Sequence, residues 1–218
     1  MKKSVLIVVG TRPEVIKMVP VYLAMRQSSV LAPVLLSTGQ HREMLDQAFA
    51  AFDVWPDHDL DLMTQGQSLT GLTAKVLVKV GAFLEEHRPE ALLVQGDTTT
   101  VMASAMAAFY QRIPVGHVEA GLRTYDMQSP WPEEMNRRVV SPLAKWHFVP
   151  TQGAEANLVG ERMAKAQVFV TGNTVIDSLL WMKERMSSEA SGVKQEAFTP
   201  FFYDQFLGEN PTARCILT

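Results

Sequence analysis

The chain has 218 residues, of which 47% are hydrophobic and 20% charged, a composition typical of a globular protein that buries a full core. The formal net charge of −3 argues against broad binding to nucleic acid or to an anionic membrane, because such binding needs a basic surface. The single cysteine, Cys215, cannot close a disulfide within the chain. No apolar run approaches the roughly 20 residues that span a bilayer, and the start has no signal-peptide pattern, so the expected location is the cytoplasm.

Six short apolar runs without polar alternation predict strands that are covered on both faces, as in a parallel sheet. They fall at residues 5–9, 33–37, 91–94, 114–118, 146–149 and 167–170. The runs between them predict helices, among them an amphipathic one at 69–86, with Ser68 as a candidate N-cap and Pro89 beyond its end, and another at 13–27. This alternation predicts an α/β fold with a doubly wound, parallel, Rossmann-like sheet.

A change of composition after Gly172 predicts two domains. Residues 1–172 would form the Rossmann-like domain, and residues 173–218 would begin a second domain that the chain cuts off. Another helix is expected through about Arg185, followed by a polar connector at 187–192.

The segment Gly10-Thr11-Arg12-Pro13-Glu14 closes the first predicted strand and opens a helix, an arrangement that favours an anionic ligand at the helix N-terminus. Arg12 and Lys17 would add positive charge at the same end. Thr11 and Glu14 also have the spacing of a capping box, so the alternative is a capped helix with two solvated cations.

Three carboxylates, Asp97, Glu119 and Glu133, are candidates for acid–base chemistry at the edge where parallel strands end. Asp97 could instead cap the helix that begins at Thr98, and Glu119 could be a solvated residue at a strand end. Glu133 and Glu134 suit the first turn of a helix that reaches about 143, with Pro132 at its first position.

The five histidines lack the spacing of a zinc site, so no metal is expected. His117 and His147 fall within predicted strands and are interpreted as buried imidazoles of the core.

Several motifs together carry a specific resemblance. They are Gly10 to Glu14 with Ile16-Lys17, residues 38–45 (TGQHREML), Gly96 to Thr100, Val118 to Arg123, Pro132 to Arg137, and Thr171 to Thr174. In this order they resemble the bacterial non-hydrolysing UDP-N-acetylglucosamine 2-epimerases. The resemblance implies the N-terminal half of a two-domain fold of the glycosyltransferase-B type, in a homodimer. It also implies interconversion of UDP-GlcNAc and UDP-ManNAc, with UDP and 2-acetamidoglucal as bound intermediates, no cofactor, and a role in cell-surface polysaccharide synthesis.

The resemblance also implies roles for individual residues. Asp97, Glu119 and Glu133 would be acid–base or orienting carboxylates, and Arg12, Lys17 and Arg137 would contact substrate. Gln40 and Glu43 match a motif at which a second UDP-GlcNAc activates some members, although Gly66 stands where such members can carry arginine. 

The family's following histidine motif and most of its UDP contacts lie beyond the part matched here, so the 218-residue chain alone is expected to be inactive. Two alternatives are a hydrolysing relative that releases ManNAc and UDP, and a non-catalytic nucleotide-sugar-binding or dimerisation fragment.

Overall fold

The computed structural model describes residues 2–39, 42–62 and 66–188. The chain divides into two compact units, Met1–Ser178 and Leu179–Thr218, and the sheet lies in the first. The predicted boundary between residues 172 and 173, and the second domain, stay predictions.

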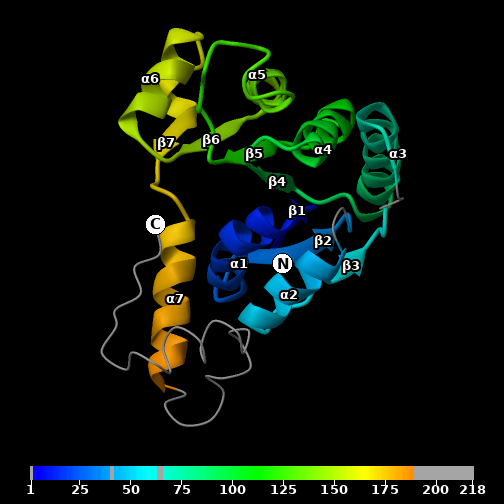
Figure 1. Ribbon diagram of the computed structural model, residues 1–218, viewed down its shortest axis with the longest axis vertical. Helices are drawn as coiled ribbons and strands as arrows, with labels where there is room; N and C mark the ends of the chain where they lie inside the picture. Colours follow the sequence, from blue (N-terminus) through cyan, green and yellow to red (C-terminus); the bar gives the residue numbers. More distant parts are fainter. Residues whose placement is uncertain (1, 40–41, 63–65, 189–218) are drawn as a thin grey trace, which may run out of the picture. The chain divides into compact units, whose positions relative to one another are not determined.

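Within the described residues, parallel strands form one seven-stranded sheet in the order β3-β2-β1-β4-β5-β6-β7 (Figure 1). The strands are β1 (Lys3–Val9), β2 (Leu31–Ser37), β3 (His58–Asp59), β4 (Ala91–Gln95), β5 (Val115–Val118), β6 (Trp146–Val149) and β7 (Val168–Val170). The six predicted strands are confirmed to within two residues at each end. The strand order reverses between β1 and β4, and such a switch point opens a crevice at the carboxyl ends of the strands.

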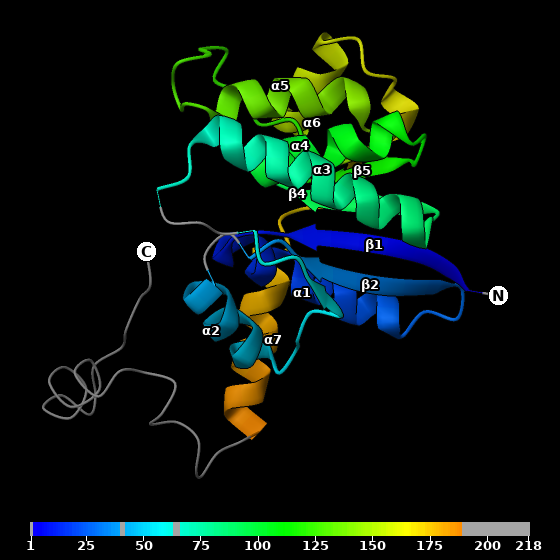
Figure 2. The same cartoon turned by 90° about the vertical axis from the view of Figure 1, so that its right-hand side faces the viewer.

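Helices cover both faces of the sheet (Figure 2). They are α1 (Arg12–Arg26), α2 (Arg42–Phe52), α3 (Leu69–His87), α4 (Thr99–Tyr110), α5 (Glu133–Leu143), α6 (Gln152–Gly160) and α7 (Val175–Ser188), with a 3-10 turn η1 (Lys165–Gln167). Helices α1 and α2 lie on one face, and α3, α4 and α5 lie on the other. The predicted doubly wound Rossmann-like architecture is therefore confirmed.

Sequence patterns explain where the long helix α3 begins, packs and ends. The Ser68 side chain accepts a hydrogen bond from Gly71 N at 3.1 Å, which confirms it as the N-cap. Apolar residues of α3 such as Val76 and Val80 are fully buried against the core. The helix stops at Arg88, which adopts a left-handed conformation just before Pro89.

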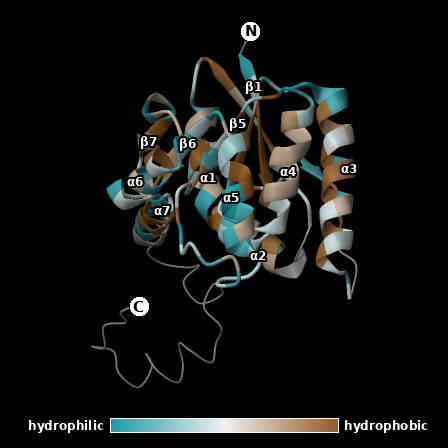
Figure 3. Cartoon of the chain, turned by 90° about the horizontal axis from the view of Figure 1, so that it is seen from above, coloured by the Kyte–Doolittle hydropathy of each residue, from teal (hydrophilic) through white to brown (hydrophobic). Residues whose placement is uncertain are grey.

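The interior of the sheet is apolar, whereas one of the covering helices is strongly polar. Figure 3 colours much of β1 as hydrophobic, and its residues 5–9 are at most 5% exposed. Helix α5 carries hydrophilic residues at its start, close to the carboxyl edge of the sheet. No described helix combines the length and the apolar composition needed to cross a bilayer.

Candidate active site

The turn between β1 and α1 is tightly packed against its neighbours. A Cβ atom at Gly10 would lie 2.6 Å from Thr38 Oγ1 and 2.7 Å from Thr100 Oγ1, so any other residue would force these buried threonine side chains to shift. Arg12 is the first residue of α1 and is exposed, and its side chain makes no hydrogen bond or ion pair with any described residue. Its guanidinium is therefore available to an anion at this helix end.

Glu14 is buried, with 2% of its surface exposed, and its carboxylate joins two turns. Oε2 accepts hydrogen bonds from the backbone N–H groups of Gly10 and Thr11, and Oε1 accepts one from Thr98 Oγ1 at 2.6 Å. Burial raises the pKa of Glu14, and these hydrogen bonds oppose the rise. The capping interaction predicted between Glu14 and the Thr11 backbone is confirmed.

Lys17 and Glu119 form an ion pair across the switch point. Lys17 Nζ lies 2.6 Å from Glu119 Oε2 and 2.9 Å from Oε1, and both side chains are mostly buried. Lys17 is therefore not the solvated cation of the alternative interpretation. Such a pair keeps a positive charge and a carboxylate together at the carboxyl edge of the sheet.

Glu119 is further fixed by two amides that the sequence analysis missed. Gln95 Nε2 donates to Glu119 Oε2, and Asn173 Nδ2 donates to Oε1 at 2.9 Å. Glu119 also has a φ of 61°. This value lies in the left-handed region, which is energetically unfavourable for residues other than glycine. The polar end of the buried strand β4, Gln95, was the available signal for one of these contacts.

Asp97 is held by Arg137. Asp97 Oδ2 accepts a hydrogen bond from Arg137 Nε at 2.8 Å and lies 2.7 Å from Nη2 in the same ion pair. Asn136 Nδ2 donates to the Asp97 carbonyl at 2.8 Å. The interpretation of Asp97 as a helix cap is wrong. Thr98 is the N-cap of α4, because its Oγ1 accepts from Val101 N, which leaves the Asp97 carboxylate directed to Arg137.

At the start of α5, Glu134 rather than Glu133 is the buried acid. Glu134 accepts hydrogen bonds from the backbone of Thr124 and Tyr125 and lies 3.2 Å from Arg137 Nη1. Burial would raise the pKa of Glu134, but these donors together hold it below its usual value. Glu133 is half-buried, and its side chain forms no hydrogen bond or ion pair with a described residue.

The position of Pro132 explains the difference. Pro132 is the N-cap of α5 and not its first helical residue as predicted, so Glu133 takes that position. Glu134 then shares a helix face with Arg137 and Ser141, which are three and seven residues further on.

His117 and His147 are neighbours in the register of β5 and β6, and both are buried as expected. His117 Nε2 lies 2.7 Å from Gly96 O, whereas neither ring nitrogen of His147 has a hydrogen-bond partner among the described residues. Burial lowers the pKa of His117 to about 4, and burial and the Arg123 charge also lower the pKa of His147. Both imidazoles are therefore neutral near pH 7.

The remaining predicted positions lie outside this cluster. Gln40 falls outside the described residues, and Glu43 falls within α2. In the described part of the chain, no group of three or more His, Cys, Asp or Glu residues could hold a metal ion.

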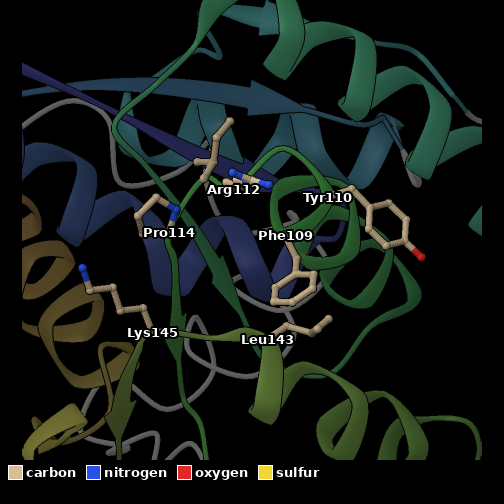
Figure 4. Close-up of a pocket in the computed structure, with 7 residues that line it drawn as sticks. Phe109, Tyr110, Arg112, Pro114, Leu143 and Lys145 are labelled. Carbon is tan, nitrogen blue, oxygen red and sulfur yellow. The ribbon is translucent and has the colours of Figure 1, made fainter.

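A separate hollow of about 520 Å³ lies at the opposite, amino end of the sheet (Figure 4). It is lined by Phe109, Tyr110, Arg112, Ile113, Pro114, Leu143 and Lys145, none of which was a predicted site residue. The charged cluster at the carboxyl edge, made of Lys17, Asp97, Glu119 and Arg137, is therefore the better candidate site.

A doubly wound parallel sheet with paired charges at its switch point defines a Rossmann-like domain of the kind that binds ligands at this edge. The family model of UDP-N-acetylglucosamine 2-epimerase matches residues 23–204. The chain belongs to the UDP-N-acetylglucosamine 2-epimerase family, which confirms the resemblance at that level.

Among curated relatives, the UDP-N-acetylglucosamine 2-epimerase of Escherichia coli (strain K12) is 50% identical over 199 residues, which are 91% of this chain and 53% of the relative. The crystal structure of UDP-GlcNAc 2-epimerase from Neisseria meningitidis bound to UDP-GlcNAc matches with a TM-score of 0.85 and 44% identity, over 97% of this chain and 54% of that chain. The Methanocaldococcus jannaschii enzyme in complex with UDP-GlcNAc and UDP matches with a TM-score of 0.79 and 31% identity, over 88% and 51%. The chain thus spans about half the length of the relatives it matches.

Proposed function

We propose that this chain supplies one half of an enzyme that interconverts UDP-GlcNAc and UDP-ManNAc by inversion at C2. The observation that carries the proposal is the pairing of Lys17 with Glu119 and of Arg137 with Asp97 at the switch point of the sheet. Relatives of the same family have been crystallised with UDP-GlcNAc and with UDP, which supports this substrate class.

The proposed reaction is elimination followed by addition. The C1–O bond to UDP breaks, and its electron pair leaves with UDP. Positive charge then develops at C1 and acidifies the C2–H bond, so that a carboxylate can take this proton and 2-acetamidoglucal forms. UDP adds back to C1 while C2 receives a proton on the opposite face. The reaction needs no net oxidation, so no cofactor is proposed.

The hydrogen bonds of the three carboxylates indicate different roles for them in this reaction. Both oxygens of Glu119 already accept hydrogen bonds, so we assign it to holding Lys17 toward the substrate. Among the described residues no donor reaches Asp97 Oδ1, and Glu133 has no partner, so these two are the proposed proton carriers. Arg12, Lys17 and Arg137 would bind the anionic leaving group and the sugar.

The proposal is tested by an assay that detects UDP-ManNAc and free ManNAc separately. It is run on the 218-residue chain and on a chimaera that continues into the second half of the Escherichia coli relative. We expect UDP-ManNAc from the chimaera and none from the 218-residue chain alone. Free ManNAc with UDP would instead support the hydrolysing alternative, and ligand binding without product would support a binding module.

Three broader expectations belong to the same proposal. The active protein would be a homodimer in the cytoplasm, and UDP-ManNAc would supply cell-surface polysaccharide synthesis. Sedimentation analysis of the active form tests the oligomeric state.

A further inference from the structure

The turn that carries Asp97 is held on both sides by buried side chains from neighbouring elements. On one side, His117 Nε2 donates a hydrogen bond to the carbonyl of Gly96 at 2.7 Å. His117 lies in β5, is 1% exposed, and its strand pairs with β4 directly before the turn. The residue before Asp97 is thereby tied to the neighbouring strand.

On the other side, the Thr98 hydroxyl donates to Glu14 Oε1 at 2.6 Å and accepts from Val101 N at 3.3 Å. Glu14 belongs to α1, and its second oxygen holds the backbone of the β1–α1 turn. The residue after Asp97 is thereby tied to the turn that carries Arg12 and leads to Lys17.

With both neighbours fixed, little freedom remains for Asp97. Its carbonyl accepts from Asn136, and its carboxylate has one oxygen on Arg137. A displacement of about 1 Å in a reacting group can lower a rate about 100-fold, so the fixation of this turn has consequences for the chemistry.

We propose that His117 and Glu14 are positioning residues for Asp97: His117 through the Gly96 carbonyl and Glu14 through the Thr98 hydroxyl. Neither would touch the substrate. The inference rests on the proposed function, because Asp97 has a role to be positioned for only if the site carries out the epimerisation.

Variants of two neighbouring histidines provide a matched test. His117→Phe removes the donor to Gly96, whereas His117→Gln keeps an N–H in the place of Nε2. His147→Phe makes the same change in a buried residue at the paired position of β6, whose ring nitrogens make no hydrogen bond to any described residue.

In the form of the protein that shows epimerase activity, we expect kcat to fall 10- to 100-fold in His117→Phe, with KM changed less than threefold. His117→Gln and His147→Phe should stay within threefold of the parent in kcat per folded molecule. Equal losses in His117→Phe and His147→Phe, or full activity in His117→Phe, would overturn the proposal for His117.

The Glu14 arm is tested through Thr98. Thr98→Ser keeps the hydroxyl, whereas Thr98→Val removes it. We expect Glu14→Gln to lower kcat about tenfold in the parent and in Thr98→Ser, and to have less than a twofold further effect in Thr98→Val. The exposed Glu86→Gln, on α3, is the control for loss of a carboxylate charge. Additive effects of Glu14→Gln and Thr98→Val would contradict the proposed route.

Amide hydrogen exchange on the 218-residue chain separates this inference from the proposed function. The amide protons of Gly96 and Val101 should exchange faster in His117→Phe and Glu14→Gln than in the parent. Their exchange rates should be unchanged in His147→Phe. If the chimaera has no epimerase activity but exchange changes as expected, the turn is held as described while the proposed function fails. Unchanged exchange in both variants would overturn the positioning itself.

Discussion

The two ends of the parallel sheet differ in what they present to a ligand. At the carboxyl end, Lys17, Glu119, Asp97 and Arg137 are paired and partly buried. At the amino end lies the hollow of about 520 Å³, and none of its lining side chains joins an ion pair within the described residues. We therefore place the proposed chemistry at the paired charges of the switch point and not at the hollow.

The largest expected effect at the carboxyl end follows from Asp97→Asn. The substitution removes the carboxylate proposed to carry a proton, so kcat of the active form should fall about 10²- to 10⁴-fold. The melting temperature should change little, because Thr98 and not Asp97 caps α4. Asp46→Asn, which removes an exposed carboxylate, is the control. Retained activity in Asp97→Asn would contradict the assignment of the chemistry to the carboxyl end of the sheet.

The second test concerns stability and uses one arginine from each region. The Arg123 side chain is fully buried and makes two hydrogen bonds of 2.7 Å to Glu161. Arg123→Met should lower the free energy of unfolding by about 3–5 kcal/mol, because it leaves a carboxylate without its partner. Arg112→Met, at the exposed rim of the hollow, should cost less than about 0.5 kcal/mol. Urea unfolding measures both, and similar losses would contradict the comparison.

The third test is the pH dependence of stability near the carboxyl end. The pKa of His117 is about 4 in the fold, with His147 and Arg123 as its neighbouring charged or titratable groups, and about 6.5 in an unfolded chain. The unfolded state therefore takes up the proton first, and stability present above pH 6.5 is lost as the pH falls toward 4. The difference in pKa corresponds to roughly 3 kcal/mol.

His117→Gln should flatten this part of the profile, leaving the smaller contribution of His147. Urea unfolding between pH 4.5 and 7.5 tests the expectation. An unchanged slope in His117→Gln would show that His117 is not the group responsible.

A small effect on stability and almost none on activity is expected for a second residue at the amino end. Lys145 Nζ sits 4.9 Å from the centre of the Trp146 ring, an exposed cation–π contact. Lys145→Gln should lower the free energy of unfolding by about 0.5–1 kcal/mol and leave kcat within twofold. If Lys145→Gln lost more activity than Asp97→Asn, the active site would have to be assigned to the amino end of the sheet.

Much of the fold follows from patterns that a single sequence contains. Buried parallel strands such as β1 and β4 are continuous apolar runs, so their positions were predictable. The strand β3 was missed because two residues, His58 and Asp59, carry no periodicity. It forms only because Leu36 and Ser37 of β2 offer a free edge, which is a tertiary effect.

The candidate site was predictable at the level of residue type and less so at the level of contacts. Asp97, Glu119, Lys17 and Arg137 meet at the edge where the strand ends place them. The burial of Glu134 instead of Glu133 depends on the residue at which α5 begins. The helix begins one residue later than predicted, at Glu133, because Pro132 is the N-cap. The Asn173 contact joins residues 54 apart in sequence, and no local pattern reports such a contact.

At position 119, which has a left-handed backbone, stability and the proposed function favour different residues. Glycine would adopt a φ of 61° without the steric cost of a Cβ atom, so selection for stability alone would favour glycine at this position. Glycine would also leave Lys17 without its carboxylate and the two amides of Gln95 and Asn173 without their acceptor. Replacing Glu119 by glycine would therefore lower the conformational energy of the backbone, but it would remove the carboxylate at the centre of the charged cluster.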